Sequence, residues 1–410
     1  MARRPVSLIL LMTALVVSAC ASSASVPLDT RPPAPPSGPR LEPTPSPAVH
    51  SAIPPAIVRH TVAMYRGDVA RTGSMPGPGP AGNPAVAWTF QANGTFNSSP
   101  VVADGIVYAA SSDGIVHALA LDSGAEAWST SVGSDVEGTP LLAGTTLIVG
   151  DVAGIVHGLA IETGRTRWTA RTKDAIHGAP VGDEHKVYVT SGDGTAYALD
   201  PASGTIRWQV SVGDTVGRSP ASSGDLLVVG SGGDLVAIHQ QDGSIAWRTA
   251  VSASGGIGTP AVSDGTAYAA VALDGDAADM GVVAVDVASG RVTWRYASPA
   301  NAQVYTPAII GDRAFVIGHD RKIVSLDRAT GTVVWSVDAP SDIEALPVFC
   351  GTTLYVVGND GPASAIDSTT GTTLWSTPIR GVPFAPIVAD GYLVVGTDLG
   401  ILYAIGGPAR

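Results

Sequence analysis

Side chains that can bind a ligand recur in this 410-residue sequence at nearly constant intervals. Eight positions lie three residues before a regularly spaced proline: Asn97, Glu137, His177, Gly217, Ile257, Val304, Glu344 and Pro383. Six more stand close to them in the sequence: Asp135, Asp174, Arg218, Tyr305, Asp342 and Phe384. Within this set, Glu137 and His177 offer a carboxylate and an imidazole, which can hold a cation or a small ligand.

If the intervals mark a repeated structural unit, corresponding positions meet at one place in the fold. The predicted binding face then consists of Glu137, His177, Arg218, Tyr305, Glu344 and Phe384. Its mixture of aromatic and charged side chains suits a surface that docks another protein. The alternative is a solvated, mildly acidic channel mouth that holds no ligand.

Other groupings of polar residues are weaker candidates. Asp274, Asp276 and Asp279 lie in an insertion, 273–280, and suggest Ca²⁺. Their spacing is not that of a calcium loop and no glutamate closes it, so we expect an exposed polar hairpin extension. His117 and His157 share one position of the repeat, which indicates packing rather than metal ligation.

The sequence carries none of the common catalytic signatures. Gly-x-Ser-x-Gly, His-Glu-x-x-His, a phosphate loop and Cys-x-x-Cys are all missing. The formal net charge of −12 argues against binding to nucleic acid or to an anionic membrane surface. We therefore predict a binding protein and not an enzyme, with no cofactor and no metal ion.

Two residue types reveal the repeat that positions these side chains. The tryptophans are Trp88, Trp128, Trp168, Trp208, Trp247, Trp294, Trp335 and Trp375. Prolines keep the same period at Pro100, Pro140, Pro180, Pro220, Pro260, Pro307, Pro347 and Pro386. A period near forty residues, interrupted by one insertion, predicts stacked copies of one structural unit.

Each period reads as four short strands. In residues 99–131, apolar runs are separated by the turn dipeptides Asp104-Gly105, Asp113-Gly114 and Ser123-Gly124. Four such strands form an antiparallel blade that must stack on its neighbours to bury both faces. Closing the stack into a ring leaves only short edges.

Each tryptophan from Trp128 onwards follows a glycine by four residues and a small residue by ten. The glycine permits a turn with positive φ, and the small residue leaves room for the indole. This Ala-x5-Gly-x3-Trp pattern resembles the tryptophan-docking motif of quinoprotein-type (PQQ-like) β-propellers over residues 85–407. The resemblance implies an all-β propeller whose tryptophans join the blades.

The repeats predict eight blades. Residues 385–406 form a last blade without a tryptophan strand, and 85–90 form a tryptophan strand without a blade. We expect these two segments to pair and close the ring; seven blades and a stray strand are the alternative. Residues 65–73 resemble the lead-in to such repeats, and the triplet Arg66-Gly67-Asp68 is too short to predict adhesion.

Quinoprotein dehydrogenases of this fold are the enzymatic alternative. They carry a Ca²⁺ ion, a catalytic aspartate and long loop insertions, and their alcohol-oxidising members add an adjacent cysteine pair. This sequence has only two cysteines, Cys20 and Cys350, and nearly all its repeats have minimum length. The repeat alone is architectural and occurs in many proteins that are not enzymes.

The N-terminus is typical of an exported lipoprotein. Residues 1–19 form a signal peptide, and Val17-Ser18-Ala19-Cys20 resembles the bacterial lipobox, which implies lipidation of Cys20. Residues 20–57 are rich in proline and predict a disordered tether. The propeller domain occupies residues 58–410.

These features together resemble the outer-membrane β-barrel assembly lipoproteins of the BamB type, although a long proline-rich tether is not typical of them. We predict a monomeric, extracytoplasmic scaffold held to the cell membrane by its lipid, at the periplasmic face of the outer membrane in two-membraned hosts. Its partners are envelope proteins of unknown identity. A quinone-dependent dehydrogenase and a carbohydrate-binding or cell-wall-binding propeller remain alternatives.

Overall fold

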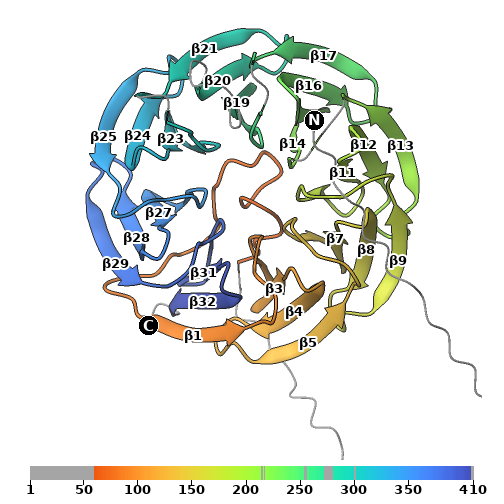
Figure 1. Cartoon of the computed structure of the whole chain (residues 1–410), viewed down its shortest axis with the longest axis horizontal. Coiled ribbons are helices and arrows are strands. Elements are labelled where there is room, and N and C mark those ends of the chain that lie inside the picture. The colour runs from red at the N-terminus through yellow and green to blue at the C-terminus, as the bar shows by residue number, and fades with distance from the viewer. Residues whose placement is uncertain are drawn as a thin grey trace, which may run out of the picture. The chain divides into compact units, whose positions relative to one another are not determined.

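The described part of the chain forms a ring of sheets. The computed structural model describes residues 60–213, 216, 218–253, 256–271, 280–299 and 302–407. These residues build eight antiparallel sheets of four strands around one axis (Figure 1). The eight-bladed propeller is confirmed, and the seven-bladed alternative is wrong. No helix among these residues is long and apolar enough to cross a membrane.

Several predictions lie outside the described residues. They concern the signal peptide 1–19, Cys20, the tether 20–57, the aspartates of the insertion and Gly217.

The first four blades follow one another along the chain. Blade 1 contains β2 (Val101–Ala103), β3 (Ile106–Ala110), β4 (Ile115–Ala120) and β5 (Glu126–Ser131). Blade 2 contains β6 (Leu141–Ala143), β7 (Thr146–Gly150), β8 (Ile155–Ala160) and β9 (Thr166–Arg171). Blade 3 contains β10 (Val181–Gly182), β11 (Val187–Ser191), β12 (Thr195–Leu199) and β13 (Ile206–Ser211). Blade 4 contains β14 (Ala221–Ser223), β15 (Leu226–Ser231), β16 (Asp234–His239) and β17 (Ile245–Ala250).

The last four blades repeat the arrangement. Blade 5 contains β18 (Ala261–Ser263), β19 (Thr266–Val271), β20 (Gly281–Asp286) and β21 (Val292–Ala297). Blade 6 contains β22 (Ala308–Ile310), β23 (Arg313–Ile317), β24 (Lys322–Asp327) and β25 (Val333–Asp338). Blade 7 contains β26 (Val348–Cys350), β27 (Thr353–Val357), β28 (Pro362–Asp367) and β29 (Thr373–Pro378). Blade 8 contains β30 (Ile387–Ala389), β31 (Tyr392–Gly396), β32 (Ile401–Gly406) and β1 (Val86–Gln91).

The ring is closed by strands from the two ends of the repeat region. In blade 8, β1 pairs with β32 in antiparallel register, with Val86 opposite Ile405 and Gln91 opposite Ile401. Figure 1 shows β1 and β32 side by side beside blade 7. The predicted closure by residues 85–90 is confirmed, with β1 extending one residue further.

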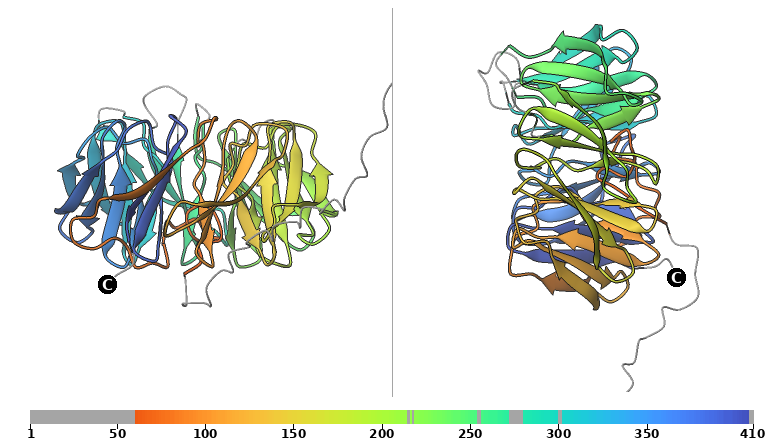
Figure 2. Two further views of the ribbon diagram at one scale, coloured as in Figure 1. Left: turned by 90° about the horizontal axis from the view of Figure 1, so that it is seen from below. Right: turned by 90° about the vertical axis from the view of Figure 1, so that its right-hand side faces the viewer.

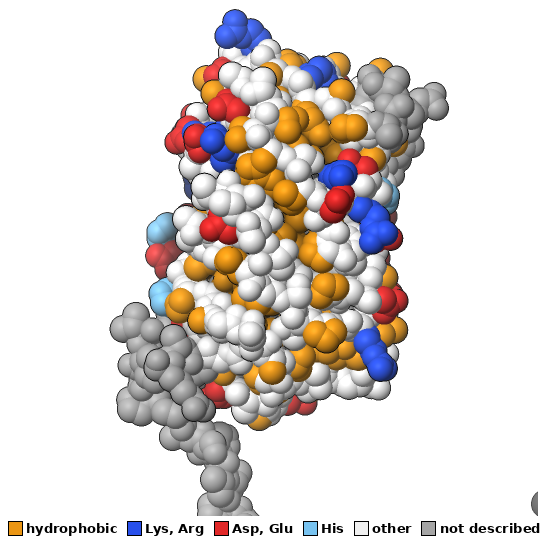
Figure 3. Space-filling model, turned by 90° about the vertical axis from the view of Figure 1, so that its left-hand side faces the viewer, with side chains coloured by type: hydrophobic (Ala, Val, Ile, Leu, Met, Phe, Trp, Pro, Cys, Tyr) orange, Lys and Arg blue, Asp and Glu red, His pale blue; other side chains and the backbone are white. Residues whose placement is uncertain are grey.

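Burial changes from the axis to the rim of the disc, which Figure 2 shows edge-on. The inner strands are short and mostly buried, whereas β5, β9, β13, β17 and β25 alternate between exposed and half-buried residues. Figure 3 shows the flank of β25 and β29, where Val333, Val334 and Leu374 are exposed. Because each outer strand has only six residues, the unpaired edges stay short.

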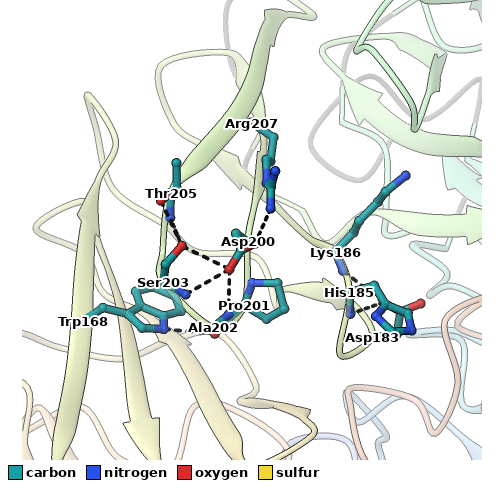
Figure 4. A network of polar contacts seen from close by, with 10 residues as sticks. All are labelled: Trp168, Asp183, His185, Lys186, Asp200, Pro201, Ala202, Ser203, Thr205 and Arg207. Atoms are coloured by element: carbon teal, nitrogen blue, oxygen red, sulfur yellow. Dashed lines mark hydrogen bonds and ion pairs between the residues drawn. The ribbon is translucent and has the colours of Figure 1, made fainter.

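The indoles join neighbouring blades through a backbone carbonyl. Trp168 of blade 2 donates its Nε1–H to the carbonyl oxygen of Pro201 in blade 3, at 2.9 Å (Figure 4). The turn that presents this carbonyl is held by Asp200, which accepts the backbone N–H of Ser203 and pairs with Arg207. The bond recurs for Trp88, Trp128, Trp208, Trp247 and Trp294.

The glycine that recurs four residues before the tryptophans has two structural causes. Gly204 has a φ of +71°, as expected for its turn. In addition, a Cβ at Gly204 would lie 2.3 Å from Cε3 of Trp168, so the indole of the preceding blade packs directly against this turn. Within a blade, the small residue Gly158 lies opposite Trp168 and leaves room for the same ring.

We expect Trp208→Ala to lower the free energy of unfolding by about 3 kcal/mol, at the low end for large core truncations. The indole is only half-buried, but it bonds to the carbonyl of Gln240 at 3.0 Å and its ring lies 5.7 Å from that of Tyr188. Denaturant unfolding measures this loss. Gln209→Ala, at the exposed next position, is the control and should change stability little; equal effects of both variants would contradict the docking role.

Candidate functional site

The loops that lead into the innermost strands surround one pocket at the axis. Its volume is about 560 Å³, and it opens on one face of the ring. All six residues of the predicted binding face line it: Glu137, His177, Arg218, Tyr305, Glu344 and Phe384. They come from blades 2, 3, 4, 6, 7 and 8, so the repeat brings together side chains that are far apart in the sequence.

Some residues expected near this pocket lie elsewhere. Ile257 and Val304 are 4% and 3% exposed and pack in clusters between blades. Ile257 forms a bridge with Val271 at the end of β19, and Val304 forms one with Gly318 just after β23. The pocket position in blade 6 therefore falls one residue later, at Tyr305. In blade 2, Val136 is buried and the next residue, Glu137, lines the pocket. In blade 6, the interval from the pocket-lining residue to the repeated proline is one residue shorter than in blade 2.

The predicted acidic neighbours do not line the pocket either. Its lining contains none of Asp135, Asp174 and Asp342. Asp342 is instead 3.0 Å from Nε of Arg321.

One wall of the pocket carries the predicted carboxylate–imidazole pair. Oε2 of Glu137 lies 2.7 Å from Nδ1 of His177, and both side chains are about two-fifths exposed. Arg218, in the next blade, has no carboxylate within 4 Å among the described residues. This wall therefore presents one internally paired acid and one cation to whatever fills the pocket.

The opposite wall combines an acid with aromatic rings. Glu344 accepts a hydrogen bond from Nδ2 of Asn359 at 2.8 Å, and the hydroxyl of Tyr305 lies 2.5 Å from Nε2 of His319. Burial, and then the charge of Glu344, raises the pKa of Tyr305 to about 12. Tyr305 is therefore neutral at physiological pH, and Phe384 continues this apolar side of the pocket.

The base of the pocket is formed by a segment that fills the centre of the ring. Residues 62–78 bond to the inner strands or their turns in blade order, through Val102, Leu142, Ser222, Val262, Ile309, Phe349 and Gly391. Blade 3 is contacted instead by the side chain of Arg71, which donates to the carbonyl oxygens of Ala179 and Pro180. This central segment, which runs through the middle of Figure 1, thus touches every blade, and its Tyr65 lines the pocket.

Two arginines anchor the central segment. Arg66 and Arg71 are 1% and 0% exposed. Arg66 donates to the carbonyl oxygens of Arg71, Thr306 and Pro307 at 2.7, 3.1 and 2.6 Å. Because Arg66 is buried, the triplet that begins with it is not available to an adhesion receptor. Burial lowers the pKa of Arg71 to about 10, so it remains charged at neutral pH.

A ring of hydroxyls near the base was not anticipated from the sequence. Residues just before the prolines bond across neighbouring blades: the N–H of Ser99 to Oγ1 of Thr139 at 3.0 Å, and the N–H of Ala179 to Oγ of Ser219 at 2.8 Å. Ser99, Thr139 and Ser219 all line the pocket. The signal was readable, because Ser or Thr stands before most of the repeated prolines.

The repeated histidines lie inside the blades. Nδ1 of His117 is 2.8 Å from Oε1 of Glu126, and Nε2 of His157 is 2.8 Å from Oδ2 of Asp151. Both imidazoles are buried, in agreement with the predicted packing role. Among the described residues, no three His, Cys, Asp or Glu side chains are placed to hold a metal ion together.

Solved structures with this fold include a BamB protein and several dehydrogenases. BamB from Moraxella catarrhalis is 20% identical and superposes with a TM-score of 0.64, covering 79% of this chain and 99% of its own. A europium-containing methanol dehydrogenase is 14% identical, with a TM-score of 0.68 and coverages of 85% and 98%. The quinohemoprotein alcohol dehydrogenase from Comamonas testosteroni is 14% identical, with a TM-score of 0.65 and coverages of 85% and 81%. At these identities the likeness shows the fold alone.

The residues at the ring centre do not fit a quinone and its metal ion. Such a pair needs clustered carboxylate or amide ligands, and the pocket's acids Glu137 and Glu344 stand on separate walls, each with its own partner. Below them, the axis is filled by peptide, with the guanidinium groups of Arg66 and Arg71 bonded to backbone carbonyls.

Sequence comparison assigns the chain to a family. No curated protein matches it. A family model described as outer membrane protein assembly factor BamB, built on PQQ-like repeats, matches residues 81–196 and 192–406. These matches span most of the chain and coincide with the eight blades and their closing strand. The chain therefore belongs to the BamB-like family of PQQ-repeat β-propellers.

Proposed function

We propose that the protein is an exported, lipid-anchored and non-catalytic interaction module of the cell envelope, which docks another protein on the face that carries the pocket. The observation that carries this proposal is the convergence of six side chains from six blades, including Tyr305 and Phe384, around one opening. Aromatic residues and arginine are enriched at the centres of protein interfaces, within a polar rim.

Family membership and the N-terminal sequence support the cellular setting. The matched family is described by an outer-membrane assembly factor. The lipobox-like string Val17-Ser18-Ala19-Cys20 favours a lipid anchor, and two or more acyl chains hold a protein stably at a membrane. The proline-rich stretch 20–57 can then serve as a spacer between membrane and propeller.

Site-specific crosslinking in the native envelope tests the docking face. A photo-crosslinking residue at His177, which is exposed at the pocket, should capture a distinct partner band. The same residue at Glu162, exposed in the turn between β8 and β9 on the other face, is the matched control and should capture none. No adduct at His177, or the same adduct at both positions, would contradict docking at the pocket.

A further inference from the structure

The base of the pocket is surrounded by arginine side chains. Arg66 and Arg71 lie in the central segment beneath it, and Arg218 lines the pocket itself. None of the three has a carboxylate within 4 Å among the described residues. Asp68 is the acid whose charge reaches Arg66 and Arg71, and it is bonded to the backbone N–H and the hydroxyl of Thr72. One carboxylate therefore faces three guanidinium groups, which leaves an excess of positive charge at the base.

Tyr65 brings an unpaired hydrogen-bond donor to this base. It lines the pocket, and its ring centroid lies 5.4 Å from Cζ of Arg71. Its hydroxyl makes no hydrogen bond among the described residues and is not sealed from solvent. Burial raises the pKa of Tyr65, and the charges of Arg66, Arg71 and Arg218 lower it in part. The hydroxyl is therefore protonated at neutral pH and, together with the guanidinium of Arg218, can donate to one anionic group.

The second tyrosine of the pocket stands in a field of the opposite sign. Burial, and then the charge of Glu344, raises the pKa of Tyr305, whereas among the described residues only arginines act on Tyr65 through their charge. The other acid of the lining, Glu137, already has an imidazole partner at 2.7 Å. An anion therefore finds its partners at Tyr65 and Arg218, away from the wall that carries Glu344.

The loops that enter blades 7 and 8 give the pocket an apolar side. They contribute six apolar residues to its lining: Ala345, Leu346, Val382, Pro383, Phe384 and Ala385. Leu346 and Phe384 are partly exposed, so a ligand that covers them removes apolar surface from water. The volume of about 560 Å³ lies in the range of small-molecule sites. An apolar body with one anionic group matches both this side and the positively charged base.

We propose that the pocket binds an organic acid, with its carboxylate at the base and its apolar body against the loops of blades 7 and 8. The hydroxyl of Tyr65 and the guanidinium of Arg218 donate to the carboxylate oxygens, and Leu346 and Phe384 contact the apolar body. A carboxylate carries one negative charge, so Glu344 repels it less than a doubly charged phosphate. A free small acid and the C-terminus of a polypeptide both offer this chemistry.

Calorimetric titration of the purified protein tests the proposal, with hexanoate, hexanamide, N-acetylleucine, N-acetylleucinamide and inorganic phosphate as probes. We expect saturable binding of at least one of the two acids. Its amide, which has nearly the same shape without the charge, should bind about tenfold more weakly or less. Tighter binding of N-acetylleucine than of hexanoate would support the proposal with a polypeptide C-terminus as the source, and the reverse order would support it with a free acid.

Two variants in the pocket test the assigned contacts. Arg218→Gln should weaken binding of the acid about tenfold or more and leave the melting temperature unchanged, because this exposed side chain has no carboxylate partner among the described residues. Tyr65→Phe keeps the ring beside Arg71 and should weaken binding about three- to tenfold. Arg165→Gln, at an exposed arginine outside the pocket, is the matched control and should bind like the unmodified protein.

The absence of saturable binding of both acids at about 10 mM would overturn the proposal. Equal affinity for an acid and its amide would overturn the role of the charged base, and binding of inorganic phosphate alone would overturn the choice of an organic ligand. Equal affinity of the Arg218→Gln, Tyr65→Phe and Arg165→Gln variants would overturn the assignment of the acid to this pocket. A missing crosslink at His177 would affect only the docking function, on which this proposal does not depend.

Discussion

Deletion of residues 62–90 should convert the closed ring into an open, aggregating chain. The deletion removes the central segment, with its bonds to all eight blades, and nearly all of β1. The edge of β32, including Leu402 and Ala404, would then lack its partner strand. An unpaired apolar edge is a template for pairing with other chains. We expect large species in size-exclusion chromatography and the loss of a cooperative melting transition.

Deletion of residues 21–57 is the control for this experiment. That stretch holds eleven prolines and cannot bury a core, so its removal should leave the melting temperature unchanged. If the protein without residues 62–90 were monomeric and melted like the control, closure by β1 and the central segment would contribute nothing to stability.

Arg71→Ala should be the most damaging single substitution in the ring centre, with a loss of about 3–5 kcal/mol in the free energy of unfolding. The guanidinium donates to the carbonyl oxygens of Tyr65 at 2.7 Å, Pro180 at 2.6 Å, Pro220 at 3.1 Å and Ala179 at 3.2 Å. Alanine would leave these acceptors facing a cavity, and it would remove the bonds of the Arg71 side chain to blades 3 and 4, although the backbone bond between Val69 and Ser222 of blade 4 would remain. Chemical denaturation of the purified protein measures the loss.

Two further variants show whether the geometry of Arg71 matters. Arg71→Lys keeps the charge but cannot reach carbonyls on several sides at once, so its stability should fall between those of the wild type and Arg71→Ala. Arg165→Ala, at an exposed turn, should change stability by no more than about 0.5 kcal/mol. An Arg71→Ala protein as stable as Arg165→Ala would show that the central segment is not an anchor.

The blades could be predicted from the sequence because each one is built locally. The tryptophan, the glycine before it and the proline that begins each unit repeat within about forty residues. Because the strands that pair are neighbours in the sequence, this spacing predicts which strands form one sheet. Even the closing pair of β1 and β32 could be predicted, because one end of the repeat lacks the strand that the other end supplies.

The central segment could not be predicted, because its structure depends on distant partners. Residues 62–78 have neither strand alternation nor a repeat, and they are ordered by bonds to one inner strand after another. The pocket was predicted in outline, since the loops before the inner strands meet at the axis. The predicted lining residue was wrong where the interval to the proline changes by one residue, so that Tyr305 and not Val304 lines the pocket.

The pairing of Gln91 with Ile401 has a consequence for how the protein is made. Blade 8 needs strands from both ends of the domain, so the ring cannot close until the last of these strands has been synthesised. Contacts this far apart in sequence also slow folding. Blades 1 to 7 can each form once their own four strands have been synthesised, whereas blade 8 can form only when β30 to β32 follow.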